Sequence, residues 1–322
     1  MDRRTLLLGG LAGALVPGLA AAQSRYPDRP VRMVVPFSPG GATDVAGRVV
    51  ADALTEILGQ PVVVENRSGS GGNIGVTAVA TSAPDGYTLM MGTQALLTQN
   101  PYLYVNLAKN PQTDLVPVAN AFKTDMIMVA SPRLGITTVP DIVALARARP
   151  DTLNYGSAGN GSAAHILMEL FKSRTGTAMR HIPYRGTAQA MADLVAGTLD
   201  LMIDSMPSAL GQIQGGSVVP IAVCGPTRNS RLPAVPTMTE TDIKDYRSIA
   251  WLAVFAPTGT PEAIVSRIDA AIKSALVKPH VLQRAEAAGL DGDYASSVDL
   301  GKRIAFEATQ WSQVITTAGI KL

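Results

Sequence analysis

The residues most suited to chemistry lie in two glycine-rich loops, at residues 36–44 and 155–162, and a stretch with helical character follows each loop. Glycine allows a sharp turn that brings backbone N–H groups close to a ligand. The first N–H groups of a helix have no acceptor within the helix, and the helix dipole makes this end positive. Each loop is therefore predicted to bind an anion, and a turn that only caps its helix is the alternative.

The candidate ligand contacts come mostly from these two loops. Asp204 lies just after a predicted strand at 199–203, and α/β proteins bind ligands at strand ends. A helix-capping role is the alternative for Asp204. The full set of candidates is Ser38, Gly40, Gly41, Thr43, Asp44, Thr93, Ser157, Ala158, Gly159, Gly161, Ser162 and Asp204.

Neither loop contains lysine or arginine. We therefore expect backbone N–H and hydroxyl groups to hold the anion, without a salt-bridging cation at its centre. Arg185 is the alternative anion contact, as part of an ordinary arginine clamp. We expect Gly41 to adopt a positive φ beside the anion, so that Gly41→Val abolishes binding.

Several enzyme signatures are incomplete. Gly159-x-Gly161-x-x-Ala164 resembles a dinucleotide fingerprint, but Met179-Arg180-His181 stands where an acidic ribose partner is expected. Ser157 is not in a nucleophile elbow, because Tyr155 occupies the place of the required glycine. The three histidines are too far apart in sequence to form a recognisable metal-ligand pattern. We expect no cofactor, no metal and no enzymatic activity.

The two loops need elements that hold them opposite each other. Short apolar strands alternate with amphipathic helices along the chain, and such alternation predicts an α/β fold with mainly parallel sheets flanked by helices. One loop lies early in the chain and the other near its middle, so we expect two lobes that face each other across a cleft. The predicted first lobe is 23–120 plus 240–322, and the predicted second lobe is 121–239.

The N-terminal segment has the pattern of an export signal. Arg3 and Arg4 precede an apolar stretch, and Ala20-Ala21-Ala22 satisfies the small-residue rule for cleavage. We expect a signal peptide at residues 1–22 and a mature periplasmic protein that begins at Gln23. The paired arginines fit twin-arginine export and fit an ordinary Sec signal equally well.

Composition narrows the class of protein further. The 27 basic and 25 acidic residues are nearly balanced, which argues against nucleic-acid binding because that function needs a basic face. Cys224 is the only cysteine and can form no internal disulfide, and its apolar neighbours predict a buried, inert thiol. A chain of 322 residues favours two domains.

Along essentially its whole mature length, the chain resembles the Bug-type receptors, the solute-binding subunits of tripartite tricarboxylate transporters. The resemblance rests on motifs that occur in the same order, namely Phe37-Ser38-Pro39-Gly40-Gly41-Ala42-Thr43-Asp44, Val64-Glu65-Asn66-Arg67-Ser68-Gly69, Pro84-Asp85-Gly86-Tyr87, Gly159-Asn160-Gly161-Ser162, Pro183-Tyr184-Arg185-Gly186 and Arg231-Leu232-Pro233-Ala234-Val235-Pro236-Thr237.

This resemblance implies two α/β lobes of a type II-like periplasmic-binding-protein fold that close on a small carboxylate. It implies that the two loops grip the carboxylate through backbone N–H groups, hydroxyls and water, and that the ligand passes to a two-subunit membrane permease. We expect the receptor to be a monomer. Two other classes stay open, a receptor that signals to a membrane kinase and, less favoured, a hydrolase that uses the same cleft.

Overall fold

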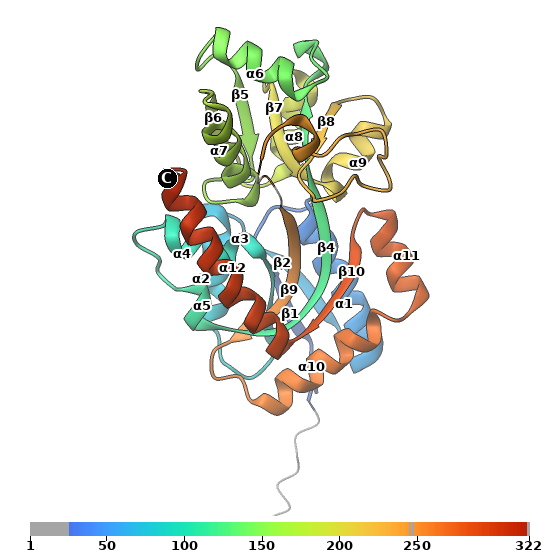
Figure 1. The fold of residues 1–322 in the computed structure, drawn as a ribbon. Helices are drawn as coiled ribbons and strands as arrows, with labels where there is room; N and C mark the ends of the chain where they lie inside the picture. The colour runs from blue at the N-terminus through green and yellow to red at the C-terminus, as the bar shows by residue number, and fades with distance from the viewer. Residues whose placement is uncertain (1–25, 245, 247, 321–322) are drawn as a thin grey trace, which may run out of the picture.

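The computed structural model describes residues 26–244, 246 and 248–320, so the expected signal peptide lies outside the described residues. The described chain forms two lobes, one above the other in Figure 1, and strand β4 (Leu115–Ala130) runs from one lobe into the other. Within the described ranges, no helix is both long enough and apolar enough to cross a membrane.

The first lobe is built on a sheet in which β2 (Val62–Asn66), β1 (Val31–Val35), β3 (Thr88–Thr93), β9 (Ile249–Pro257) and β4 follow one another, with β10 (Asp291–Ser296) paired to β4. β1 is parallel to β2 and β3. β9 is antiparallel to β3 and β4, because β4 leaves for the second lobe and β9 returns from it. The expected parallel pairing thus holds in the outer strands, and the crossing strands make the sheet mixed.

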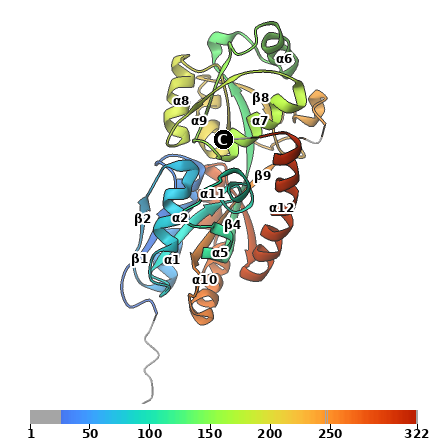
Figure 2. The same ribbon diagram turned by 90° about the vertical axis from the view of Figure 1, so that its left-hand side faces the viewer.

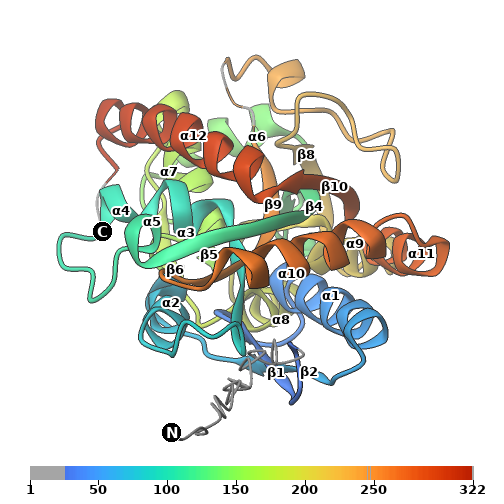
Figure 3. The same cartoon turned by 90° about the horizontal axis from the view of Figure 1, so that it is seen from below.

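Helices cover both faces of this sheet. α1 (Ala42–Leu58), α10 (Glu262–Ala275) and α11 (Pro279–Ala287) share a hydrophobic core with one face. The opposite face is covered by α2 (Asn73–Ala80), α3 (Gln94–Thr98) and α12 (Ser297–Thr317). Figure 3 shows α1 beside α10, with α12 across the sheet from them. The short helices α4 (Asn100–Leu103) and α5 (Pro111–Asp114) lead into β4.

The second lobe repeats this plan on a smaller sheet. β5 (Asn154–Ser157) is parallel to β6 (Arg180–Pro183) and β7 (Leu201–Ser205), whereas β4 is antiparallel to β7 and β8 (Val219–Val223). Its helices are α6 (Val139–Ala148), α7 (Ala163–Thr175), α8 (Thr187–Ala196) and α9 (Met206–Gln214). Cys224, just after β8, is fully buried, which confirms the predicted buried thiol.

Strand pairing locates the two places where the chain changes lobe. β4 pairs with β9 as far as Asp125 and with β7 from Met126 onward. The return crossing lies near Ser248, whose N–H donates to the Cys224 carbonyl 2.7 Å away. We therefore propose lobe boundaries near residues 125 and 248, in place of the expected 120 and 239.

The C-terminal helix α12 contacts both lobes. Leu300, near its start, is part of the core on one face of the first lobe. Trp311 and Ile315, near its end, pack into the core of the second lobe. Figure 2 shows α12 rising along one side of the molecule from the first lobe toward the second.

Candidate ligand-binding cleft

A small cavity of about 80 Å³ lies between the two lobes, at the point where both glycine-rich loops meet. A water needs roughly 10–15 Å³ on this measure, so the cavity has room for several waters or a small organic molecule. The residues that line it are Phe37, Ser38, Gly41, Ala42, Thr43, Thr93, Gln94, Ala95, Thr124, Met126, Ala158, Ser162, Ala163, Ala164, Thr187, Asp204, Ser205, Ala250 and Leu252.

The N-terminus of α1 faces this cavity from the first lobe. Gly41 is the N-cap, with extended φ and ψ of −86° and 170°. Ala42 and Thr43, the next two residues, both line the cavity, and within the described residues their N–H groups have no hydrogen-bond acceptor. Helix N-terminal N–H groups without acceptors are suited to binding an anion.

The N-terminus of α7 faces the same cavity from the second lobe. Ser162 is the N-cap, and its hydroxyl accepts a hydrogen bond from the His165 N–H at 3.4 Å. The N–H groups of Ala163 and Ala164 likewise have no acceptor in the described part of the chain, and both residues line the cavity. Two helix N-termini therefore converge on one small space.

Contacts between the lobes close the cavity at its edges. The Ser38 hydroxyl donates to the Arg185 carbonyl at 3.2 Å, and the Tyr104 hydroxyl donates to the Asn160 carbonyl at 2.5 Å. Arg185 thus meets the first lobe through its backbone, and its side chain belongs to a separate surface groove rather than to the cavity lining. Within the part of the chain that the structure describes, the lining contains no lysine, arginine or histidine.

Seven of the twelve candidate residues line the cavity, and five do not. The seven are Ser38, Gly41, Thr43, Thr93, Ala158, Ser162 and Asp204. The five others, Gly40, Asp44, Ser157, Gly159 and Gly161, lie in the same loops but are engaged with the protein itself.

Asp44 positions the first loop instead of lining the cavity. Its carboxylate accepts hydrogen bonds from the Gly40 N–H at 3.1 Å, from Arg48 at 2.9 and 3.0 Å, and from the Asn66 amide at 2.9 Å. The same Asn66 amide donates to the Phe37 carbonyl at 3.0 Å. Burial raises the pKa of Asp44, but these hydrogen bonds outweigh it and lower the pKa overall. Asp44 therefore has no oxygen left over for a ligand.

The two glycines of the first loop have different reasons to be glycine. Gly40, and not Gly41, has the positive φ, at +93°. Gly41 has a negative φ, so the expectation of a left-handed turn there is corrected. A side chain at Gly41 would instead crowd the opposite lobe, because its Cβ would lie 3.0 Å from Thr187 Oγ1.

The second loop is held together by its own polar groups. The Ser157 hydroxyl accepts from the Gly159 N–H at 3.0 Å and lies 2.7 Å from His181 Nε2. The Gly161 N–H donates to His165 Nδ1 at 3.3 Å. Gly159 and Gly161 have φ of +115° and +73°, so both need glycine for backbone reasons.

The Ser157–His181 contact was not evident from sequence, since 24 residues separate the two. It has the donor–acceptor distance of a nucleophile and its base. Ser157 is fully buried, however, and burial lowers the pKa of His181 to about 3, with help from His165 and Lys172. His181 is stacked between Tyr155 and His165. A base with so low a pKa accepts a proton poorly at neutral pH, and its serine is out of reach of the cavity.

Asp204 contributes the ionisable side chain of the cavity lining. Its Oδ1 accepts from the Ser205 N–H at 2.7 Å and from the Ser205 hydroxyl at 3.3 Å. Its Oδ2 has no hydrogen-bond partner among the described residues. Burial raises the pKa of Asp204 to about 6, and the neighbouring Ser208 and Ser205 limit this rise.

Apart from Thr93 and Asp204, sequence reasoning missed the cavity residues that lie outside the two loops. Thr187 comes from the start of α8, Thr124 and Met126 from the middle of β4, and Ser205 from the end of β7. Only the position of Ser205 beside Asp204 at a strand end carried a usable signal. The others reach the cavity through the packing of one lobe on the other.

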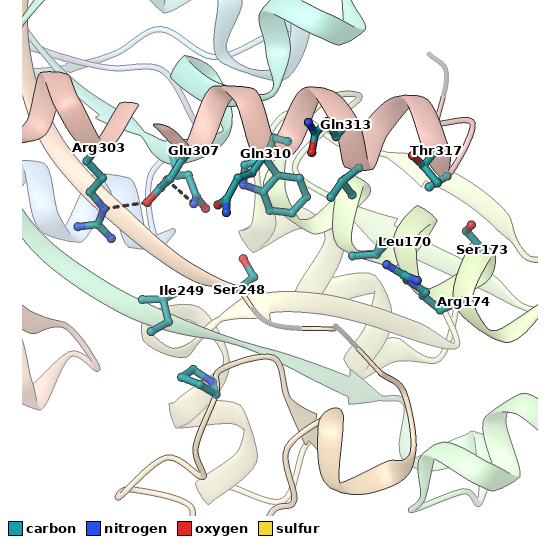
Figure 4. A pocket seen from close by; sticks show the side chains of 15 residues that line it. Leu170, Ser173, Arg174, Ser248, Ile249, Arg303, Glu307, Gln310, Gln313 and Thr317 are labelled. Carbon is teal, nitrogen blue, oxygen red and sulfur yellow. Dashed lines mark hydrogen bonds and ion pairs between the residues drawn. The ribbon is translucent and has the colours of Figure 1, made fainter. Parts of the chain in front are cut away.

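A larger and more open groove of about 930 Å³ lies elsewhere, between α12 and the second lobe. Figure 4 shows Arg303, Glu307 and Gln310 on α12 above Ser248, with Leu170 and Arg174 nearby. The Glu307 carboxylate already accepts from Arg303, Gln94 and Trp251. We favour the small cavity as the ligand site because the free N–H groups of α1 and α7 face it.

Comparison with known proteins agrees with this architecture. Residues 46–320 match the family described as the tripartite tricarboxylate transporter family receptor. A solved structure of the periplasmic binding protein BugD is 32% identical, with a TM-score of 0.88, covering 92% of this chain and 99% of BugD.

Two further similar structures contain ligands. Rpa4515 of R. palustris, solved with adipate, is 34% identical, with a TM-score of 0.89 and coverage of 92% of this chain and 99% of that chain. MatC of Rhodopseudomonas palustris, solved with bound malate, is 31% identical, with a TM-score of 0.87 and coverage of 90% and 100%. The chain therefore belongs to the tripartite tricarboxylate transporter receptor family, as a periplasmic solute-binding protein of the Bug type.

Proposed function

We propose that this protein captures a small carboxylate in the cavity between its lobes and delivers it to a two-subunit membrane permease. The observation that carries the proposal is the pair of opposed helix N-termini. Ala42 and Thr43 on one side and Ala163 and Ala164 on the other offer four N–H groups that have no acceptor among the described residues. The adipate and malate in two related structures support a carboxylate as the ligand class.

The energetics of this grip are adequate without a cationic side chain. A hydrogen bond to a charged group contributes roughly 1.5–3 kcal/mol. Association costs about 4–15 kcal/mol. The four backbone hydrogen bonds offset this cost together with further hydrogen bonds from hydroxyls, such as that of Thr43, and from water. A micromolar dissociation constant corresponds to about −8 kcal/mol and is within reach of this arrangement.

We propose further that the receptor acts as a monomer in the periplasm, without a cofactor and without catalysis. Burial of Ser157 and the low pKa of His181 disfavour the hydrolase alternative. The alternative in which the protein signals to a membrane kinase uses the same cavity. Deleting the permease genes separates the two, because a transport receptor then no longer supports uptake of its ligand.

The experiment that tests carboxylate capture is native mass spectrometry of the purified protein, followed by thermal unfolding with a panel of acids. A ligand at ~100 times its dissociation constant adds about 2.7 kcal/mol of stability. For a protein of this size we expect a rise in Tm of several degrees. ATP and NAD serve as controls. A panel that leaves Tm unchanged, with ATP or NAD raising it, contradicts the proposal.

A further inference from the structure

Asp204 is the buried side chain whose hydrogen bonding the carboxylate grip leaves incomplete. It is only 1% exposed and lines the cavity between the lobes. Ser205 saturates Oδ1 with two hydrogen bonds, whereas Oδ2 has none among the described residues. Buried polar atoms in native proteins are almost always paired, so a buried carboxylate oxygen without a donor needs an explanation.

The neighbouring side chains do not supply that donor. Among the described residues, no lysine, arginine or histidine lines the cavity, so none of them balances the charge of the carboxylate. Ser208 lies close enough to affect the titration of Asp204, but its hydroxyl donates to Thr187 Oγ1 at 3.3 Å. A molecule that fills the cavity is therefore placed to supply the missing donor.

We propose that Asp204 Oδ2 accepts a hydrogen bond from the ligand, so that the ligand is a small acid carrying a hydroxyl or ammonium group near its carboxylate. This inference rests on the proposed capture of a carboxylate and specifies its class. The helix N-termini hold the carboxylate, and Asp204 selects among acids by the substituent.

The charges in the cavity favour an arrangement in which the helix N-termini bind the carboxylate and Asp204 binds the substituent. Each helix N-terminus carries the equivalent of about half a positive charge, so the two together offset roughly one negative charge. An ionised Asp204 facing a plain carboxylate would add a second negative charge without a donor between them. A hydroxyl on the ligand donates its single hydrogen to Asp204, and an ammonium group donates in the same way and also neutralises one negative charge. A pKa of about 6 leaves Asp204 mainly ionised at neutral pH, which suits an acceptor.

The first test compares acids that differ only in the substituent. We suggest calorimetry at pH 7 with three sets: propionate, lactate and alanine; succinate, malate and aspartate; glutarate, 2-hydroxyglutarate and glutamate. Native mass spectrometry adds any co-purified acid and its unsubstituted analogue. In at least one set we expect the hydroxy or amino acid to bind at least tenfold more tightly than the plain acid, which is the gain of about one such hydrogen bond.

Two variants locate the effect at Asp204. Asp204→Ala removes the acceptor, and we expect the ratio of affinities within a set to fall to near unity. Asp52→Ala is the matched control, because it removes an exposed aspartate that does not line the cavity, and it should preserve the ratio. A ratio measured within one variant is insensitive to a uniform loss of affinity, so partial disturbance of the cavity does not confuse the result.

The number of protons taken up on binding distinguishes an Asp204 that accepts a hydrogen bond from an Asp204 that is protonated and donates one. If Asp204 instead becomes protonated and donates to a plain acid, calorimetry in buffers of different ionisation enthalpy records uptake of about one proton on binding. Asp204→Asn should then abolish that uptake. We expect uptake near zero. Plain acids that bind as tightly as their substituted partners, or a proton taken up in wild type and not in Asp204→Asn, overturn this inference and leave carboxylate capture intact. If no acid binds at all, the proposed function itself fails.

Discussion

Replacing the first helical residue of α1 and of α7 by proline tests the N–H grip directly. Ala42 and Ala163 occupy the first position of their helices, where proline fits because that N–H has no partner in the helix. The residue before a proline must be extended, and both N-caps are, with φ and ψ of −86° and 170° at Gly41 and −68° and 155° at Ser162. Each substitution therefore removes one donor from the cavity while the helix is kept.

The expected loss follows from the value of one hydrogen bond to a charged group, roughly 1.5–3 kcal/mol. At about 1.4 kcal/mol for each factor of ten, Ala42→Pro and Ala163→Pro should each weaken carboxylate binding by about 10- to 150-fold. Isothermal titration calorimetry with the acid found by native mass spectrometry gives the dissociation constants. Circular dichroism and Tm without ligand should stay close to wild type.

Glu262→Pro is the matched control, because Glu262 is the exposed first residue of α10, at the far end of the first lobe from the cavity. It should leave the dissociation constant unchanged. Arg185→Ala should also have little effect, since the arginine side chain lies outside the cavity lining. If both cavity prolines bind the acid normally while Arg185→Ala does not bind it, an arginine clamp replaces the N–H grip and our reasoning is refuted.

Three further outcomes are expected. Gly41→Ala should fold normally but bind the carboxylate at least tenfold more weakly in calorimetry, because its Cβ would lie 3.0 Å from Thr187 Oγ1. Adding Thr187→Ala to this variant should restore part of the affinity. An unchanged affinity of Gly41→Ala contradicts this expectation. Burial lowers the pKa of His165 to about 4 and that of His181 to about 3 in the folded protein. As the pH drops below about 6.5, these histidines become protonated in the unfolded chain before they do so in the folded one, so the free energy of unfolding decreases. Urea unfolding at pH 7 and pH 5 should show a loss of about 2 kcal/mol for each histidine, absent in His165→Gln/His181→Gln and retained in the exposed control His280→Gln. Intact mass of the exported protein should correspond to a chain that begins at Gln23, and a mass that retains residues 1–22 argues against the signal peptide.

Local signals in the sequence were sufficient to predict the two helix N-termini that face the cavity. Gly40 and Gly41 before Thr43, and Gly159 to Ser162 before α7, correctly predicted loops that lead into helices facing a cleft. The role of Asp44 was also readable, since Arg48 follows at a spacing of four and forms an ion pair with it. Asp44 is a predicted ligand contact, but it lies outside the cavity lining and its carboxylate is paired with Arg48.

Contacts between segments that are distant in the sequence could not be predicted from local patterns. Thr187 restricts Gly41 from across the cleft, and no spacing within either segment indicates that the two meet. The length of β4 is also not evident from local patterns, because Pro117 argues against a central strand. The register of β4 against β9 shifts just after Pro117, so the missing N–H falls at an irregularity where the ladder is already interrupted.

The placement of α12 has a consequence for how the two lobes can separate. β4 and the return strand β9 join the lobes on one side, and α12 reaches from Leu300 in one core to Trp311 and Ile315 in the other. If the last turns of α12 stayed with the first lobe, opening would expose Trp311 to water at a cost that grows with the apolar area uncovered. Opening therefore costs least when the end of α12 moves together with the second lobe.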